Sequence, residues 1–88
     1  MVNYRIVYTR QAAKDAKKAN VSGFRANIEE LLALIAVNPW QNPPPYEKLV
    51  GYLAGATSRR INIQHRLVYQ VIKKEKAIKI LRMWTHYE

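Results

Sequence analysis

The spacing of apolar residues changes twice along this chain, and these changes limit the folds open to it. From Val2 to Tyr8 apolar and polar residues alternate, which is the period of a half-buried strand. Between Arg10 and Asn38 the apolar residues recur every three or four positions, as in an amphipathic helix. From Thr57 onward the alternation returns. The chain therefore combines strands at both ends with a helical middle.

Two helices are predicted in the middle region. The first spans Arg10–Asn20 with Thr9 as its N-cap, and its lysines face outward. The second spans Ser22–Asn38 and ends before Pro39, because a proline disfavours helical geometry in the preceding residue. Its broad apolar stripe consists of Phe24, Ile28, Leu31, Leu32 and Ile35. The short break between the two predicts a helical hairpin.

Three strands are predicted after a stiff connector at Pro43–Pro45. They span Thr57–Ile63, His65–Ile72 and Ala77–Tyr87, with a tight turn at 73–76 between the last two. The predicted order is β-α-α-β-β-β in one domain over residues 1–88. This order favours an α+β fold with a mainly antiparallel sheet and the helices on one side.

The composition narrows the classes of partner. Fifteen Lys and Arg against six Asp and Glu give a net charge of +9 in 88 residues, a field that attracts polyanions. Nucleic acid, the ribosome, an acidic protein and an anionic membrane surface all remain open. The absence of cysteine excludes disulfides, thiolate catalysis and cysteine-based zinc sites. No apolar stretch is long enough to span a membrane, so a cytoplasmic location is expected.

The two histidines differ in their expected roles. His86 is the leading candidate for proton transfer, because histidine titrates near neutrality. If the chain cuts RNA, such a group can protonate the 5′-oxygen that departs from the phosphate. His65 shares the inward strand face with Leu67 and Tyr69, which favours a structural, partly buried histidine. Without a carboxylate or cysteine at ligand spacing, two histidines predict neither a metal site nor a cofactor.

Candidate substrate-binding groups accompany His86. Arg66 is predicted on the sheet face away from the helices, where a guanidinium can clamp a phosphate. Arg59 and Arg60 alternate faces, so one joins Arg66 and the other points outward. Glu47 follows the prolines and is either a general base or a helix N-terminal carboxylate. Arg82 and Trp84 share a face of the last strand with His86, and Trp40, Trp84 and the tyrosines offer stacking surfaces.

Several of these residues fall in segments that resemble a known family. The segments are Pro45-Tyr46-Glu47-Lys48-Leu49, Leu53-Ala54-Gly55, Ser58-Arg59-Arg60-Ile61-Asn62, His65-Arg66-Leu67-Val68-Tyr69 and Thr85-His86-Tyr87. Together they resemble the Txe/YoeB toxins of the RelE/ParE superfamily, the toxin halves of bacterial type II toxin–antitoxin pairs. The resemblance runs over essentially the whole chain and is densest from residue 47 onward. It implies a RelE-like fold related to the microbial ribonucleases.

The resemblance also implies a function. Such a protein is a metal-independent endoribonuclease that binds the ribosomal A site and cuts mRNA there through attack of a 2′-hydroxyl. Glu47 would be its general base, Arg66 would stabilise the transition state, and His86 would be its general acid, while Tyr87 would position the substrate. The implied partners are the ribosome, mRNA, an acidic YefM/Axe-like antitoxin and, in some relatives, a second copy of the chain.

The chain departs from its relatives at three positions. Gln64 replaces a glutamate of several relatives, Trp84 replaces an arginine of many, and Glu88 follows the usual terminal tyrosine. Arg82 is then a candidate for the missing cation.

Two other functions remain open. The alternatives to a ribonuclease are a non-catalytic inhibitor of the gyrase-poisoning type and a plain RNA-binding domain. Neither of them requires Glu47, Arg66 and His86 together.

Overall fold

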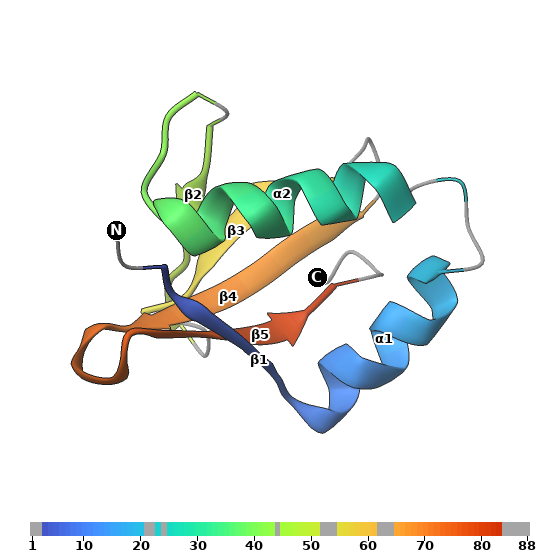
Figure 1. The fold of residues 1–88 in the computed structure, drawn as a ribbon, viewed down its shortest axis with the longest axis horizontal. Coiled ribbons are helices and arrows are strands. Elements are labelled where there is room, and N and C mark those ends of the chain that lie inside the picture. The colour runs from blue at the N-terminus through green and yellow to red at the C-terminus, as the bar shows by residue number, and fades with distance from the viewer. Residues whose placement is uncertain are drawn as a thin grey trace.

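The computed structural model describes residues 3–20, 23, 25–43, 45–51, 55–61 and 65–83. Over these residues the chain forms two α-helices and five strands in one sheet (Figure 1). The elements are β1 (Arg5–Tyr8), α1 (Arg10–Asn20), α2 (Arg25–Val37), β2 (Glu47–Lys48), β3 (Thr57–Arg60), β4 (Arg66–Ile72) and β5 (Ala77–Arg82). A short 3-10 turn, Lys73–Glu75, joins β4 to β5.

The sheet has the strand order β1-β5-β4-β3-β2. The β1–β5 pair is parallel and the other three pairs are antiparallel. Helix α2 crosses over the sheet, and α1 lies against β1 and β5 at one end (Figure 1). The predicted α+β fold with a mainly antiparallel sheet is therefore confirmed. No helix in the described part of the chain is long and apolar enough to cross a membrane.

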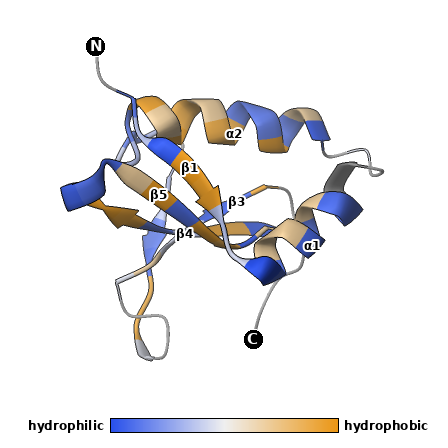
Figure 2. Cartoon of the chain, turned by 60° about the horizontal axis from the view of Figure 1, so that its bottom comes forward, coloured by the Kyte–Doolittle hydropathy of each residue, from blue (hydrophilic) through white to orange (hydrophobic). Residues whose placement is uncertain are grey.

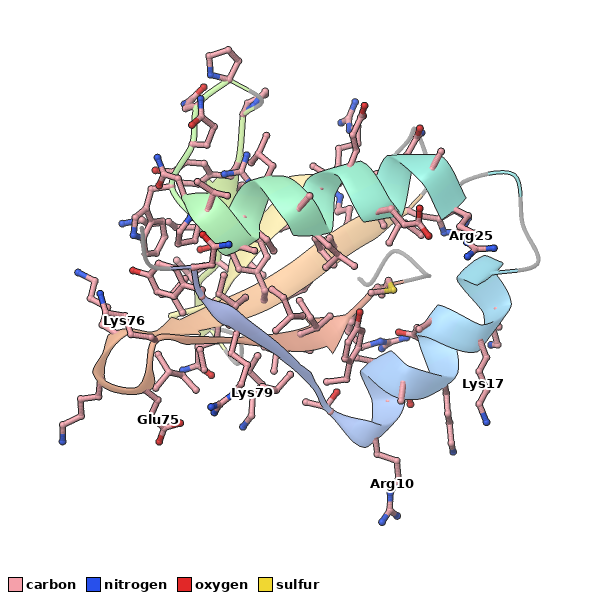
Figure 3. All side chains as sticks on the ribbon, in the orientation of Figure 1. Arg10, Lys17, Arg25, Glu75, Lys76 and Lys79 are labelled. Carbon is pink, nitrogen blue, oxygen red and sulfur yellow. The ribbon has the colours of Figure 1, made fainter. Side chains whose placement is uncertain are left out.

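The helix boundaries follow local signals in the sequence. Helix α1 begins directly after Thr9, whose Oγ1 accepts a hydrogen bond from the backbone N–H of Ala12 at 3.0 Å, as predicted for an N-cap. Ala12 is fully buried, whereas the neighbouring Ala13 is exposed. Arg10 and Lys17 project from α1 into solvent (Figure 3). Helix α2 ends at Val37, two residues before Pro39.

The core lies between the helices and one face of the sheet. Its buried members are Ala12, Ile28, Ile35, Ile61, Leu67, Tyr69, Ile78, Ile80 and Met83. Figure 2 shows apolar residues along α2, β1, β4 and β5. Tyr69 pairs with Thr57 of β3, and Thr57 pairs with Lys48 of β2. Because paired residues share a face, this register places Lys48 on the helix side of the sheet.

An irregularity in β5 reconciles its alternation with the core. Val68 pairs with Arg82 but Tyr69 pairs with Ile80, so Leu81 is one extra residue in β5. Such a bulge shifts the alternation by one position. Ile78 and Ile80 before the bulge and Met83 after it consequently all belong to the core.

A buried carboxylate ties α1 to the end of β5. Asp15 is 1% exposed and accepts hydrogen bonds from Arg82 Nε at 3.0 Å, the Met83 N–H at 3.1 Å and Gln11 Nε2 at 3.0 Å. Burial by itself raises the pKa of Asp15, but these hydrogen bonds and the charge of Arg82 lower that pKa to below its ordinary value. The charged form is thus the one that the folded state favours.

We expect Asp15→Asn to lower the free energy of unfolding at pH 7 by about 2–3 kcal/mol, because buried donors lose their charged acceptor. A lowered pKa gives stabilisation that is complete above about pH 5 and is lost as the pH falls below about 4. Chemical denaturation at pH values from 7 to 3 should therefore show that the free energy of unfolding falls less in Asp15→Asn than in the wild type. Glu30→Gln, at an exposed position of α2, is the control and should follow the wild-type curve.

Candidate functional site

A shallow pocket of about 370 Å³ lies on the sheet face away from the helices. Its lining is Pro45, Tyr46, Glu47, Ser58, Arg60 and Arg66. Register explains this grouping: Glu47 pairs with Ser58, and Arg60 pairs with Arg66. Ser58 pairs with Val68, which alternates with the core residues Leu67 and Tyr69. The alternation thus brings an acid, a hydroxyl and two guanidinium groups to one side of three adjacent strands.

Glu47 and Arg66 meet at the mouth of this pocket. Arg66 Nη1 lies 3.5 Å from Glu47 Oε1, and the two side chains are 34% and 67% exposed. An ion pair this exposed contributes at most about 1 kcal/mol, so an incoming anion can separate it at little cost. The carboxylate is then free to accept a proton, and the guanidinium is free to bind a phosphate.

Arg60 joins Arg66, whereas Arg59 does not. Arg60 is exposed and lines the pocket. Arg59 is 1% exposed: its Nε donates to the Tyr69 hydroxyl at 2.9 Å, and its Nη2 donates to the carbonyls of Pro39 and Gln41 at 3.1 and 2.7 Å. The prediction that one of these arginines points outward while the other joins Arg66 is therefore wrong for Arg59, which points inward. Its guanidinium holds the loop after α2 and has no open surface for a substrate.

Arg82 also has a partner within the fold. Its guanidinium donates to the buried Asp15 carboxylate at 3.0 Å, and its side chain is 32% exposed. A cation held in this way is partly neutralised, which counts against Arg82 as the replacement for the arginine that relatives carry at position 84.

His65 is half-buried, in line with its predicted structural role. Trp84, His86 and Tyr87 lie outside the described residues, so their roles stay predictions.

The sequence-based prediction did not single out Ser58 as a pocket residue. Ser58 is 1% exposed, and among the described residues its Oγ has no hydrogen-bond partner. The signal was available, since Ser58 stands two positions before Arg60 and so shares its strand face. As for metals, no three His, Cys, Asp or Glu side chains of the described residues are grouped in a way that could hold a metal ion.

The chain resembles several solved structures. It is 36% identical to a chain of the YoeB–YefM complex from Staphylococcus aureus, with a TM-score of 0.81 and coverage of 98% of this chain and 100% of that chain. It is 26% identical to the YoeB/ParE toxin from Agrobacterium tumefaciens, with a TM-score of 0.83 and coverage of 94% and 99%. YafQ from E. coli shares the fold at 20% identity, with a TM-score of 0.76 and coverage of 94% and 93%. No curated protein sequence matches the chain.

The fold and these likenesses define a small protein of the RelE-like α+β class. Residues 6–87 match the family described as the YoeB-like toxin of bacterial type II toxin–antitoxin systems. Since that match covers nearly the whole chain, the protein belongs to this family of toxins. The resemblance predicted from the sequence segments is confirmed at this level.

Proposed function

We propose that this toxin is a metal-independent endoribonuclease that binds the ribosomal A site and cuts mRNA there. The observation that carries the proposal is the pairing of Glu47 with Arg66 in an open pocket, with Arg60 beside them. A general base and a phosphate-binding cation are the two groups that attack by a 2′-hydroxyl requires on the nucleophile's side. A protein that only coats RNA needs the cations but has no chemical use for the carboxylate.

In the proposed reaction, Glu47 removes a proton from the nucleophile and His86 supplies one to the leaving group. The phosphate of the substrate displaces Glu47 from Arg66, and the freed carboxylate takes the proton of the 2′-hydroxyl. The 2′-oxygen then forms a bond to phosphorus while the bond from phosphorus to the 5′-oxygen breaks. Arg66 stabilises the added negative charge, and His86 gives its proton to the departing 5′-oxygen. The products are a 2′,3′-cyclic phosphate and a 5′-hydroxyl.

The proposal includes an inhibitory partner. A net charge of +9 favours binding of an acidic partner chain. The similar toxin from S. aureus was solved as a complex with YefM. We infer that a cognate acidic antitoxin covers the basic surface of this chain and folds as it binds. We also propose that this chain forms a homodimer. A YoeB from S. aureus that is 36% identical to this chain was solved as a dimer.

Mapping of mRNA ends in a bacterial translation reaction tests the ribonuclease proposal. With the wild type we expect new ends inside codons that occupy the A site, each carrying a 2′,3′-cyclic phosphate. His86→Ala should form these ends about 10²–10⁴-fold more slowly, because the leaving oxygen loses its acid. Naked mRNA incubated under the same conditions serves as the control for dependence on the ribosome.

Two results would contradict the proposal and point to the other functions. Intact mRNA together with trapped DNA breaks would identify an inhibitor of the gyrase-poisoning type. Tight binding of RNA without any cut, with His86→Ala behaving as the wild type, would identify a plain RNA-binding domain. In both cases Glu47 and Arg66 would form a surface ion pair without a catalytic role.

A further inference from the structure

A second recess lies on the other side of the edge strand β2. It has a volume of about 190 Å³ and is lined by Trp40, Lys48, Leu49, Gly55, Ala56 and Thr57. Lys48 follows Glu47 directly in a two-residue strand, so the two side chains point to opposite faces of the sheet. Because β2 is the last strand of the sheet order, its outer edge pairs with no other strand among the described residues. A ligand chain that crosses this edge therefore reaches both the Glu47 pocket and the recess.

The recess combines an indole with an ammonium group. Lys48 Nζ lies 5.4 Å from the centre of the Trp40 ring, and the rings of Trp40 and Tyr46 lie 6.1 Å apart at 55°. Trp40 is half-buried and Lys48 is exposed. An exposed cation–π contact is weaker than the stacking of a base on an indole, so a base can displace the ammonium from the ring. The displaced ammonium then becomes available to a phosphate.

Buried side chains fix the position of this indole. Trp40 lies between Pro39 and Gln41, whose carbonyls both accept hydrogen bonds from the buried Arg59. The Tyr69 hydroxyl donates to the same Pro39 carbonyl at 2.9 Å. Arg59 also supports the neighbouring Tyr46, because its guanidinium carbon lies 4.9 Å from the centre of the Tyr46 ring. Such support favours a binding surface, because a preorganised ring loses little freedom when a base stacks on it.

From these contacts we infer that the recess formed by Trp40 and Lys48 is a nucleotide subsite for single-stranded RNA. Trp40 stacks on a base near the scissile phosphate, and Lys48 binds the phosphate of that nucleotide. This inference rests on the proposed function, in which the ligand that reaches Glu47 is RNA. The charge of the chain and the contact of Lys48 with the face of Trp40 favour RNA over an acidic peptide, which would use the ammonium but not the stacking surface.

The test is a binding measurement that needs no cleavage. The probe is a short single-stranded RNA with 2′-O-methyl groups, which lacks the attacking hydroxyl. The chain has two tryptophans, so a Trp84→Phe background leaves Trp40 as the sole indole. We expect the probe to quench the fluorescence of Trp40. With a labelled probe, anisotropy should show that Trp40→Leu raises Kd about 5- to 100-fold and that Trp40→Phe largely restores binding.

A salt titration tests the role of Lys48. Loss of one phosphate contact should reduce the slope of log K against log salt by about 0.7 in Lys48→Ala. Lys17→Ala is the matched control, because Lys17 is an exposed lysine of α1, at the other end of the molecule from β2 (Figures 1 and 3). This control should leave the slope unchanged. Thermal melting of each variant establishes that it is folded.

Three results would overturn the inference. One is binding of the probe without quenching of Trp40, and another is an equal change of salt slope in Lys48→Ala and Lys17→Ala. The third is quenching by an acidic antitoxin peptide but not by RNA, which would make the recess a protein-binding surface. Cleavage of mRNA by the wild type combined with any of these refutes the subsite alone. Quenching by RNA in a protein that does not cut mRNA refutes the ribonuclease proposal alone.

Discussion

Glu47→Gln should slow the cutting of mRNA on translating ribosomes by about 10²–10⁴-fold while leaving the protein folded. The rate falls because an amide cannot take the proton of the 2′-hydroxyl, and general base catalysis contributes factors of this size. The fold survives because the Glu47 side chain is 67% exposed and its pair with Arg66 is weak. Single-turnover cleavage and thermal melting measure the two effects separately.

Glu29→Gln provides a matched control for this experiment. Glu29 on α2 also forms an exposed ion pair, with Arg25 Nε at 2.9 Å, but it lies on another element and away from the Glu47 pocket. Its substitution should leave the rate unchanged. If Glu29→Gln and Glu47→Gln cut mRNA equally fast, Glu47 is not the base. The alternative of a helix N-terminal carboxylate is wrong in either case, because Glu47 lies in strand β2.

The second large effect separates Arg59 from Arg66. Arg59→Met should lower the free energy of unfolding by about 2–4 kcal/mol, because the carbonyls of Pro39 and Gln41 lose a donor. For a domain of this size the melting temperature should fall by roughly 10–25 °C. Arg66→Met should change stability by about 1 kcal/mol or less, since its pair with Glu47 is exposed.

Activity should rank the two variants in the opposite order. At a temperature where both are folded, Arg66→Met should cut about 10²–10³-fold more slowly, because a preorganised positive charge is lost from the transition state. Arg59→Met should keep most of its activity per folded molecule. Guanidinium denaturation and single-turnover cleavage on the same preparations give both numbers. A stable Arg59→Met variant without activity would return Arg59 to the list of substrate-binding residues.

The helices could be predicted from the sequence because their signals are local. The range of α1 and its Thr9 cap are as predicted, since a cap and a run of helix formers both act within a few residues. The apolar stripe of α2 likewise predicts its buried Ile28 and Ile35. The face of Arg66 followed from alternation with Leu67, because the period of a strand is two.

The features that sequence reasoning missed depend on distant residues. Strand β2 has only two residues, and it is defined by pairing with β3 rather than by its own pattern. Arg59 and Arg60 are chemically identical. The pairing of Arg59 with the core residue Leu67 of β4, and the carbonyls of Pro39 and Gln41 about twenty positions earlier, select Arg59 as the buried one. The extra residue in β5 is visible only in its pairing with β4. No local signal encodes these choices.

The parallel pairing of β1 with β5 has a consequence for the order of events during synthesis. Arg5 pairs with Ala77 and Tyr8 with Ile80, so β1 leaves the ribosome well before the strand with which it pairs. The carboxylate of Asp15 likewise accepts two of its three described hydrogen bonds from Arg82 and Met83, and the third comes from Gln11 on its own helix. The sheet therefore cannot be completed on a nascent chain from which β5 has not yet emerged. A growing toxin stays incompletely folded beside the very machine that its finished form is proposed to attack.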